Sequence, residues 1–159
     1  PTHRLTNSSI MFKPLAFFAI LAVACNAEVI LDVNQCPGSA PLPQRVRVNC
    51  DSWPCGLSAG ESVEVSFDVN VTTEVTQMPT VVTIYPSGGG EITFPLPTGD
   101  ACSAVQAPSA CPLSEGTHTI VFPVVLNGLP VGTSTARVAI ADQAGRAVAC
   151  GMIDVTFSG

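Results

Sequence analysis

The cysteines are the residues whose number and spacing are most informative about possible chemistry, namely disulfide formation or metal binding. The chain has seven of them among its 159 residues. One of them, Cys25, lies in an apolar segment close to the start of the chain. The other six are Cys36, Cys50, Cys55, Cys102, Cys111 and Cys150. In an exported domain six cysteines predict three disulfides, although composition alone leaves many pairings open.

Metal binding and catalysis would need residues that this sequence does not group together. The closest cysteines, Cys50 and Cys55, are separated by four residues, which does not match the tight spacing of zinc ligands. Beyond the apolar segment His118 is the one histidine, and its polar surroundings predict an exposed residue near the start of a strand. With no second histidine and no nucleophile motif, we expect no enzymatic activity, no metal site and no cofactor.

The acidic residues fall mostly at alternating polar positions or in turns, which is typical of solvated faces and not of a catalytic carboxylate pair. From Glu28 onward the chain holds twelve acidic residues against four arginines and no lysine, a formal charge of −8. A domain this acidic cannot neutralise a run of phosphates, so we exclude nucleic acid as a partner.

The start of the chain has the pattern of a secretory signal peptide. The first methionine is Met11, and Lys13 is followed by the apolar residues 15–24 and by the small residue Ala27. We therefore predict that residues 1–10 are read-through of an untranslated leader, residues 11–27 a signal peptide, and residues 28–159 a single domain. A membrane anchor is the less favoured alternative, because the apolar run is too short to span a bilayer.

β-Strands must position these candidate residues, because short runs rich in valine, threonine and isoleucine recur along the chain. The clearest run is residues 62–72, where apolar and polar residues alternate as in a strand with one buried face. Further strands are predicted at residues 29–33, 45–49, 80–85, 91–94, 117–125, 133–141 and 147–157. Seven or eight short strands without a convincing helix predict an all-β fold, an antiparallel β-sandwich.

Two features of these strands bear on function. The apolar residues between positions 117 and 141 are aliphatic with few rings, so the interior could enclose a lipid or could pack on itself, and both alternatives stay open. Asn70-Val71-Thr72 is a glycosylation sequon on the polar side of its predicted strand, which predicts a glycan on Asn70.

The order of the cysteines and their flanking residues resembles that of a known family. The motifs are Cys50-Asp-Ser-Trp-Pro-Cys55, Phe94-Pro-Leu-Pro-Thr-Gly-Asp-Ala-Cys102, Cys111-Pro-Leu113 and Asp142-Gln-Ala-Gly-Arg-Ala-Val-Ala-Cys150, preceded by Cys36. Together they resemble the ML lipid-recognition family, which includes the soluble Niemann-Pick type C sterol carrier and the house-dust-mite group 2 allergens. The resemblance implies an immunoglobulin-like β-sandwich whose two sheets enclose one lipid.

The resemblance also implies specific residues. Its disulfides fall on Cys36 with Cys150, Cys50 with Cys55, and Cys102 with Cys111. The residues at the mouth of its sterol tunnel fall on Ile92, Phe94, Val124, Val125 and Leu129.

The function implied is that of a secreted or lysosomal sterol- or lipid-binding carrier, which we expect to be a monomer holding one sterol, fatty acid or other lipid. The alternative is a lipid-recognition module of innate immunity or chemosensation that acts through a membrane-protein receptor. A third alternative is a solid structural sandwich without a ligand.

Overall fold

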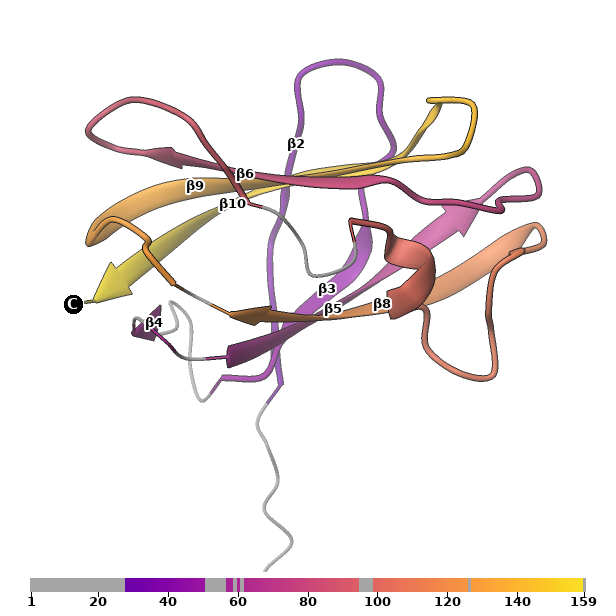
Figure 1. Ribbon diagram of the computed structural model, residues 1–159, viewed down its shortest axis with the longest axis horizontal. Helices are drawn as coiled ribbons and strands as arrows, with labels where there is room; N and C mark the ends of the chain where they lie inside the picture. The colour runs from indigo at the N-terminus through magenta and orange to yellow at the C-terminus, as the bar shows by residue number, and fades with distance from the viewer. Residues whose placement is uncertain are drawn as a thin grey trace, which may run out of the picture.

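A computed structural model describes residues 28–50, 57–58, 60, 62–94, 99–125 and 127–158 of the chain. These residues form two β-sheets stacked face to face, with β6, β9 and β10 in one layer and β3, β5 and β8 in the other (Figure 1). The prediction of an all-β sandwich is therefore confirmed. All neighbouring strands are antiparallel except β4 and β10, which are parallel.

The first sheet has four strands in the order β1-β3-β5-β8. They are β1 (Val29–Ile30), β3 (Gln44–Val48), β5 (Ser62–Val71) and β8 (Gly116–Val125). β5 and β8 pair along their whole length, from Ser62 opposite Val125 to Val71 opposite Gly116. Pro123 interrupts no ladder because β8 is an edge strand of this sheet, where a missing N–H is tolerated.

The second sheet has the order β2-β10-β9-β6-β7, with β4 also beside β10. Its strands are β2 (Asn34–Gln35), β4 (Leu57–Ser58), β6 (Thr80–Pro86), β7 (Ile92–Phe94), β9 (Gly132–Ala141) and β10 (Ala147–Ser158). β9 and β10 form a long hairpin whose turn lies at Gln143 to Gly145, as the turn residues predict.

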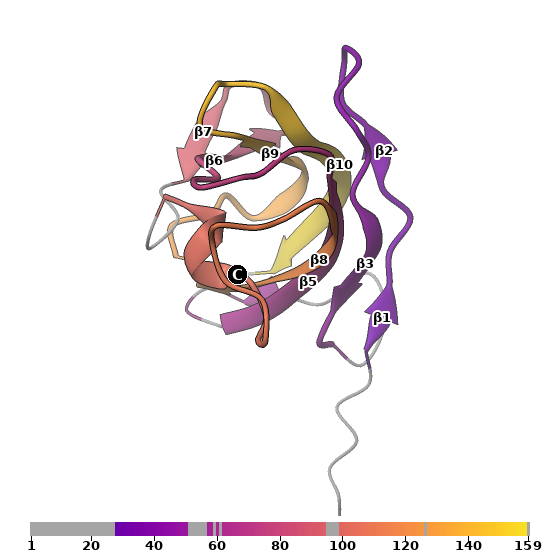
Figure 2. The ribbon, with the colours of Figure 1, turned by 90° about the vertical axis from the view of Figure 1, so that its right-hand side faces the viewer.

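The predicted single strand at residues 29–33 is wrong, because the chain changes sheets there. β1 pairs with β3 in the first sheet, whereas β2 pairs with β10 in the second, and the two strands run along one side of the sandwich (Figure 2). Between them the side chain of Leu31 is buried, and its N–H donates a hydrogen bond of 2.8 Å to the carbonyl of Val46. The alternating apolar pattern is the same whether the chain stays in one sheet or passes from one sheet to the other, so the pattern does not reveal the change.

Two short elements were not predicted from the sequence. β4 has only two residues, too few for an alternation pattern. A 3-10 helix, η1 (Ala101–Ala104), lies between the predicted strands at residues 91–94 and 117–125, and Asp100 caps it by accepting a hydrogen bond of 2.8 Å from the Cys102 N–H. With β4 and with β1 and β2 as separate strands, the described residues contain ten strands instead of the seven or eight predicted.

The expectation that the acidic residues are solvated is wrong for Asp68. This carboxylate faces outward from the centre of the four-stranded sheet, yet its residue is only 1% exposed. Arg45 forms an ion pair with it, and the Thr119 hydroxyl donates a hydrogen bond of 2.8 Å to Asp68 Oδ1. Arg45 has a φ of +47°, a conformation that residues other than glycine rarely adopt, and it lies where the register between β3 and β5 shifts.

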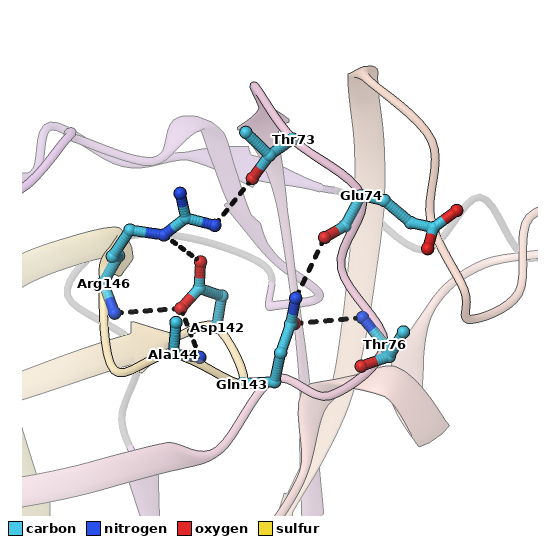
Figure 3. Close-up of polar contacts among 7 residues, drawn as sticks. All are labelled: Thr73, Glu74, Thr76, Asp142, Gln143, Ala144 and Arg146. Atoms are coloured by element: carbon cyan, nitrogen blue, oxygen red, sulfur yellow. Dashed lines mark hydrogen bonds and ion pairs between the residues drawn. The ribbon is translucent and has the colours of Figure 1, made fainter.

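The expectation is also wrong for Asp142, which lies buried in the β9–β10 turn (Figure 3). Its Oδ1 accepts hydrogen bonds from the N–H groups of Ala144 and Arg146, and its Oδ2 accepts one of 2.7 Å from Arg146 Nε. Burial raises the pKa of Asp142, but these hydrogen bonds and the charge of Arg146 outweigh it and lower the pKa below its usual value.

The same turn is tied to the connection between β5 and β6. Arg146 donates to the hydroxyl of Thr73 at 2.9 Å (Figure 3). The Gln143 side chain donates to the carbonyl of Glu74 and accepts from the N–H of Thr76, each at 3.1 Å. Since β5 and β6 belong to different sheets, this network joins the two layers at one end of the sandwich.

Two of the three predicted disulfides are present among the described residues. Cys36 is bonded to Cys150 and joins the end of β2 to β10, while Cys102 is bonded to Cys111 beside η1. Cys50 is also disulfide-bonded. Its predicted partner, Cys55, lies outside the described residues, as do the predicted leader and signal peptide.

Candidate functional site: a cavity between the sheets

A cavity of about 380 Å³ lies between the two sheets. The inward-facing side chains of both sheets line it, because alternate residues of a strand point to opposite faces. From the four-stranded sheet and its flanking segments come Leu31, Val33, Pro43, Val46, Val48, Val63, Val65, Phe67, Phe122, Pro123, Val124, Val125, Asn127 and Leu129. From the other sheet come Val82, Ile84, Phe94, Ala136, Val138, Ile140, Ala149, Gly151, Ile153, Val155 and Phe157.

The cavity distinguishes this sandwich from one that packs on itself. Native interiors contain few voids larger than a water molecule, whereas cavities that hold small molecules measure about 300–1,000 Å³. The small side chains of Ala136 and Ala149 occupy inward positions of β9 and β10 and leave space there. The interior between the described strands is therefore hollow.

The lining is uncharged and almost entirely apolar. Among the described lining residues Asn127 is the one with a polar side chain. Nothing in this lining could compensate the burial of an ionised group, which costs far more than the burial of a hydrogen-bonded hydroxyl. The interior therefore suits a hydrocarbon body, with any polar group of the ligand placed close to Asn127.

The cavity reaches the surface near the end of β8. In the described part of the lining only Pro123, Val125 and Asn127 are exposed, and these three lie within five positions of one another in the sequence. Val125 is 46% exposed although it lines an apolar cavity. A mouth at this end explains how a side chain can belong both to the interior and to the surface.

Four of the five residues assigned to the ligand site line the cavity: Phe94, Val124, Val125 and Leu129. Ile92 does not line it and is 36% exposed, at the far end of the short edge strand β7. Phe94 is the last residue of that strand and is half-buried, with its partner Val82 on the neighbouring strand also lining the cavity. Asn127, which also lines the cavity, was not among the residues assigned to the site from the sequence.

Most of the lining was not assigned to a site from the sequence, although the signal was present. Val63, Val65 and Phe67 are the apolar members of the clearest alternating pattern in the chain, which identified them as one buried face. Alternation alone does not distinguish a face that packs against another sheet from one that faces a cavity.

The remaining sequence candidates lie away from the cavity. Asn70 is exposed on β5. His118 is half-buried where an exposed residue was expected, and its Nε2 lies 2.8 Å from the carbonyl oxygen of Ser114 and its Nδ1 3.3 Å from Ser109 Oγ. These contacts attach the loop before β8 to the strand. In the described part of the chain no group of three histidine, cysteine or acidic residues is placed to hold a metal ion.

Comparison with known proteins agrees with this architecture. Residues 31–157 match the family model of the ML domain. A crystal structure of a Niemann-Pick type C2 protein from Japanese carpenter ant is similar, with a TM-score of 0.67 and 12% sequence identity. The superposition covers 80% of this chain and 100% of that chain, which shows a shared fold. A search of curated proteins found no match. No helix among the described residues is long and apolar enough to cross a membrane.

Proposed function

Since the chain belongs to the ML domain family, we propose that it is a carrier that binds one lipid, a sterol or a molecule of similar size, in the cavity between its sheets. The observation that carries this proposal is the 380 Å³ cavity with its uncharged, apolar lining. A cavity of this kind binds by removing hydrocarbon from water and needs no charged partner.

The magnitude of this effect is sufficient for tight binding. A lipid that buries about 400 Å² of apolar surface gains on the order of 10 kcal/mol at ~25 cal/mol/Å², before the costs of association. Asn127 at the mouth supplies one hydrogen-bonding group for the polar end of the ligand. This arrangement favours a neutral lipid with a hydroxyl group over one that places a carboxylate inside.

Binding is tested by titration of a fluorescent sterol into the purified protein and into two variants. Ala136→Phe places a ring inside the cavity, where Ala136 lines β9. Thr133→Phe places the same ring on the same strand at an exposed position that does not line the cavity. We expect binding by the wild type and by Thr133→Phe and a loss of at least tenfold in Ala136→Phe; equal affinity of both variants would contradict the proposal.

We propose a non-catalytic role for the same reason. Among the described residues the cavity lining holds no acid, base or nucleophile, and the hydrogen bonds of His118 are directed to its own loop. A carrier needs only to take up and release its ligand. His118→Ala should therefore leave lipid binding unchanged.

We further propose that the protein is secreted or delivered to the lysosomal lumen as a monomer. The signal-peptide pattern of residues 11–27 supports export, and the disulfides fit an oxidising compartment. Export would give the glycosylating enzymes access to Asn70, which lies exposed on β5. Release of N-linked glycans from the secreted protein, followed by mass measurement of the peptide containing Asn70, tests this assignment.

A second candidate function is lipid recognition that acts through a membrane-protein receptor. Exposed apolar side chains close to the lipid site favour it, namely Val125 (46% exposed), Val131 (72% exposed) and Ile92 (36% exposed). A contiguous patch of such residues would mark a contact with another protein. Val131→Ser should weaken receptor capture by the lipid-loaded protein while its lipid affinity stays unchanged.

A further inference from the structure

A second pocket lies on the outer face of the six-stranded sheet, with the sheet itself between it and the large cavity. It has a volume of about 240 Å³ and is lined by Pro37, Tyr85, Arg137 and Met152. The alternation of the strands places these residues outside, because their neighbours Ile84, Val138 and Ile153 face the large cavity. Arg137 and Met152 are directly opposite each other on β9 and β10.

Arg137 is distinguished from the other arginines of the described residues by having no partner there. Arg45, Arg47 and Arg146 each form an ion pair with an acidic residue. Arg137 forms no ion pair and no hydrogen bond through its side chain within the part of the chain that the structure describes, and its Nε atom is buried. A partly buried guanidinium group with an unsatisfied N–H is an unusual feature in a native structure.

Asp154 is an acidic residue on the same face, and it forms no ion pair with Arg137. Asp154 lies two residues from Met152 on β10, and it accepts a hydrogen bond of 2.7 Å from the hydroxyl of Thr135. Asp154 is exposed, whereas Arg137 is half-buried. Among the described residues no acidic side chain pairs with Arg137, so a group from outside the chain can match its positive charge.

We propose that this pocket binds a small amphipathic carboxylate. The guanidinium group of Arg137 matches a carboxylate with two parallel hydrogen bonds, a geometry that favours arginine over a simple point charge. Tyr85, Met152 and Pro37 provide an aromatic ring, a thioether and a pyrrolidine ring as walls for the apolar part of the ligand. The volume of 240 Å³ limits that part to a small body such as one substituted ring.

The charge of the whole domain adds a constraint on the ligand. With a formal charge of −8 from Glu28 onward, the protein repels anions in general, so binding depends on the local charge of Arg137. A polyanion gains only one favourable contact and many unfavourable ones. A monovalent carboxylate therefore fits the pocket better than a phosphate chain.

Benzoate is a suitable probe, and its binding can be followed by titration of the backbone amide signals in two-dimensional NMR spectra. We expect saturable shifts at residues 85, 137 and 152, and at least tenfold weaker binding by Arg137→Met. Arg47→Met removes the same charge from the other sheet and is the matched control, which we expect to bind benzoate within twofold of the wild type. Benzyl alcohol, which has the ring without the charge, should bind at least tenfold more weakly than benzoate.

Asp154→Asn provides a second, independent variant, because it removes a negative charge from the same face and should strengthen benzoate binding about twofold or more. This result is informative even if Arg137→Met does not fold. The proposal is overturned if Arg137→Met binds benzoate with wild-type affinity, or if Arg47→Met loses as much benzoate affinity as Arg137→Met. It is also overturned if Asp154→Asn does not bind benzoate more tightly than the wild type. Chemical-shift changes at residues of the large cavity, such as Phe67 and Ile140, would contradict it as well. The results with the three variants leave the lipid-binding proposal unaffected, since the two sites lie on opposite faces of the sheet. Shifts at Phe67 and Ile140 would instead count against the preference of the large cavity for a neutral lipid.

Discussion

Phe94 is the single residue whose role separates a hollow sandwich from a packed one. It ends the short edge strand β7, is half-buried, and lines the cavity. In a solid core, removal of a phenylalanine ring costs about 3–5 kcal/mol. Here Phe94→Ala enlarges an existing cavity, so we expect the ligand-free protein to lose under about 1 kcal/mol while a fluorescent sterol binds at least tenfold more weakly.

Ile92→Ala is the matched control for this prediction, because Ile92 lies on the same strand without lining the cavity. Its lipid affinity should equal that of the wild type. Thermal unfolding of the ligand-free variants and sterol titration measure the two quantities separately. A large stability loss in Phe94→Ala together with unchanged sterol affinity would assign Phe94 to a packed core and contradict our interpretation.

Asp142 gives a second prediction at the scale of one residue, and it concerns pH. Its pKa in the folded protein is below the usual value for aspartate, so its ionised form stabilises the fold. That contribution is complete at neutral pH and is lost as the pH falls through the lowered pKa of the folded state. Asp142→Asn should therefore be less stable than the wild type at pH 7, and the difference should shrink in strongly acidic solution.

Chemical denaturation at several pH values measures this difference in the free energy of unfolding. Glu74→Gln is the control, because Glu74 takes part in the neighbouring contacts through its backbone carbonyl and not through its carboxylate. We expect its stability to follow that of the wild type at each pH. A stability difference between Asp142→Asn and the wild type that does not change with pH would show that the carboxylate charge is not the stabilising feature.

At the scale of elements, the two described disulfides differ in the length of chain that they close. Cys36 and Cys150 are separated by 114 positions, and Cys102 and Cys111 by 9. In the chain-entropy model these loops contribute about 4.7 and about 2.7 kcal/mol. Replacement of Cys36 and Cys150 by serine should therefore destabilise the protein by about 2 kcal/mol more than the same replacement of Cys102 and Cys111.

Denaturant unfolding of the two double variants measures the comparison, and peptide mapping verifies the pairing in the wild type. A peptide in which Cys50 is joined to Cys102 would overturn both the pairing and the order of stabilities. The pair Cys50 and Cys55 remains a prediction that the same peptide map tests.

The element scale also shows what could be predicted from the sequence. The long strands β5, β8, β9 and β10 follow from alternation, because each presents one apolar face to the interior. The division between β1 and β2 could not be predicted, since the change of sheet depends on pairing with β3 and β10, which are distant in sequence. The burial of Asp68 likewise depends on Arg45, which lies 23 positions away and on another strand.

The same distinction applies to the cavity. The resemblance to a lipid-binding family assigned Ile92, Phe94, Val124, Val125 and Leu129 to the mouth of a tunnel, and in the structure all of these except Ile92 line the cavity. The cavity itself is a property of the spacing between two sheets, which no local pattern encodes. For that reason the sequence could not show that Ile92 lies outside the cavity lining while Phe94, on the same strand, belongs to it.

At the scale of the whole molecule, the hydrogen-bond network that joins the two sheets and the opening of the cavity lie at different ends of the sandwich. The network around Asp142 joins the β9–β10 turn to the β5–β6 connection. The cavity reaches the surface close to Val125, at the opposite end of β8 from Gly116, which pairs with Val71 next to that connection. A sandwich that is tied at one end and reaches solvent at the other can admit a lipid without breaking its polar contacts.

The central claim is that the interior holds one lipid, and native mass spectrometry of the purified protein tests it most directly. We predict a complex with one added lipid, which extraction identifies as a largely apolar molecule with a single polar end. If the purified protein carries none, incubation with vesicles that contain sterol should produce the one-to-one complex. A protein that stays at the mass of the bare chain after incubation with both sterol and fatty acid would contradict the account.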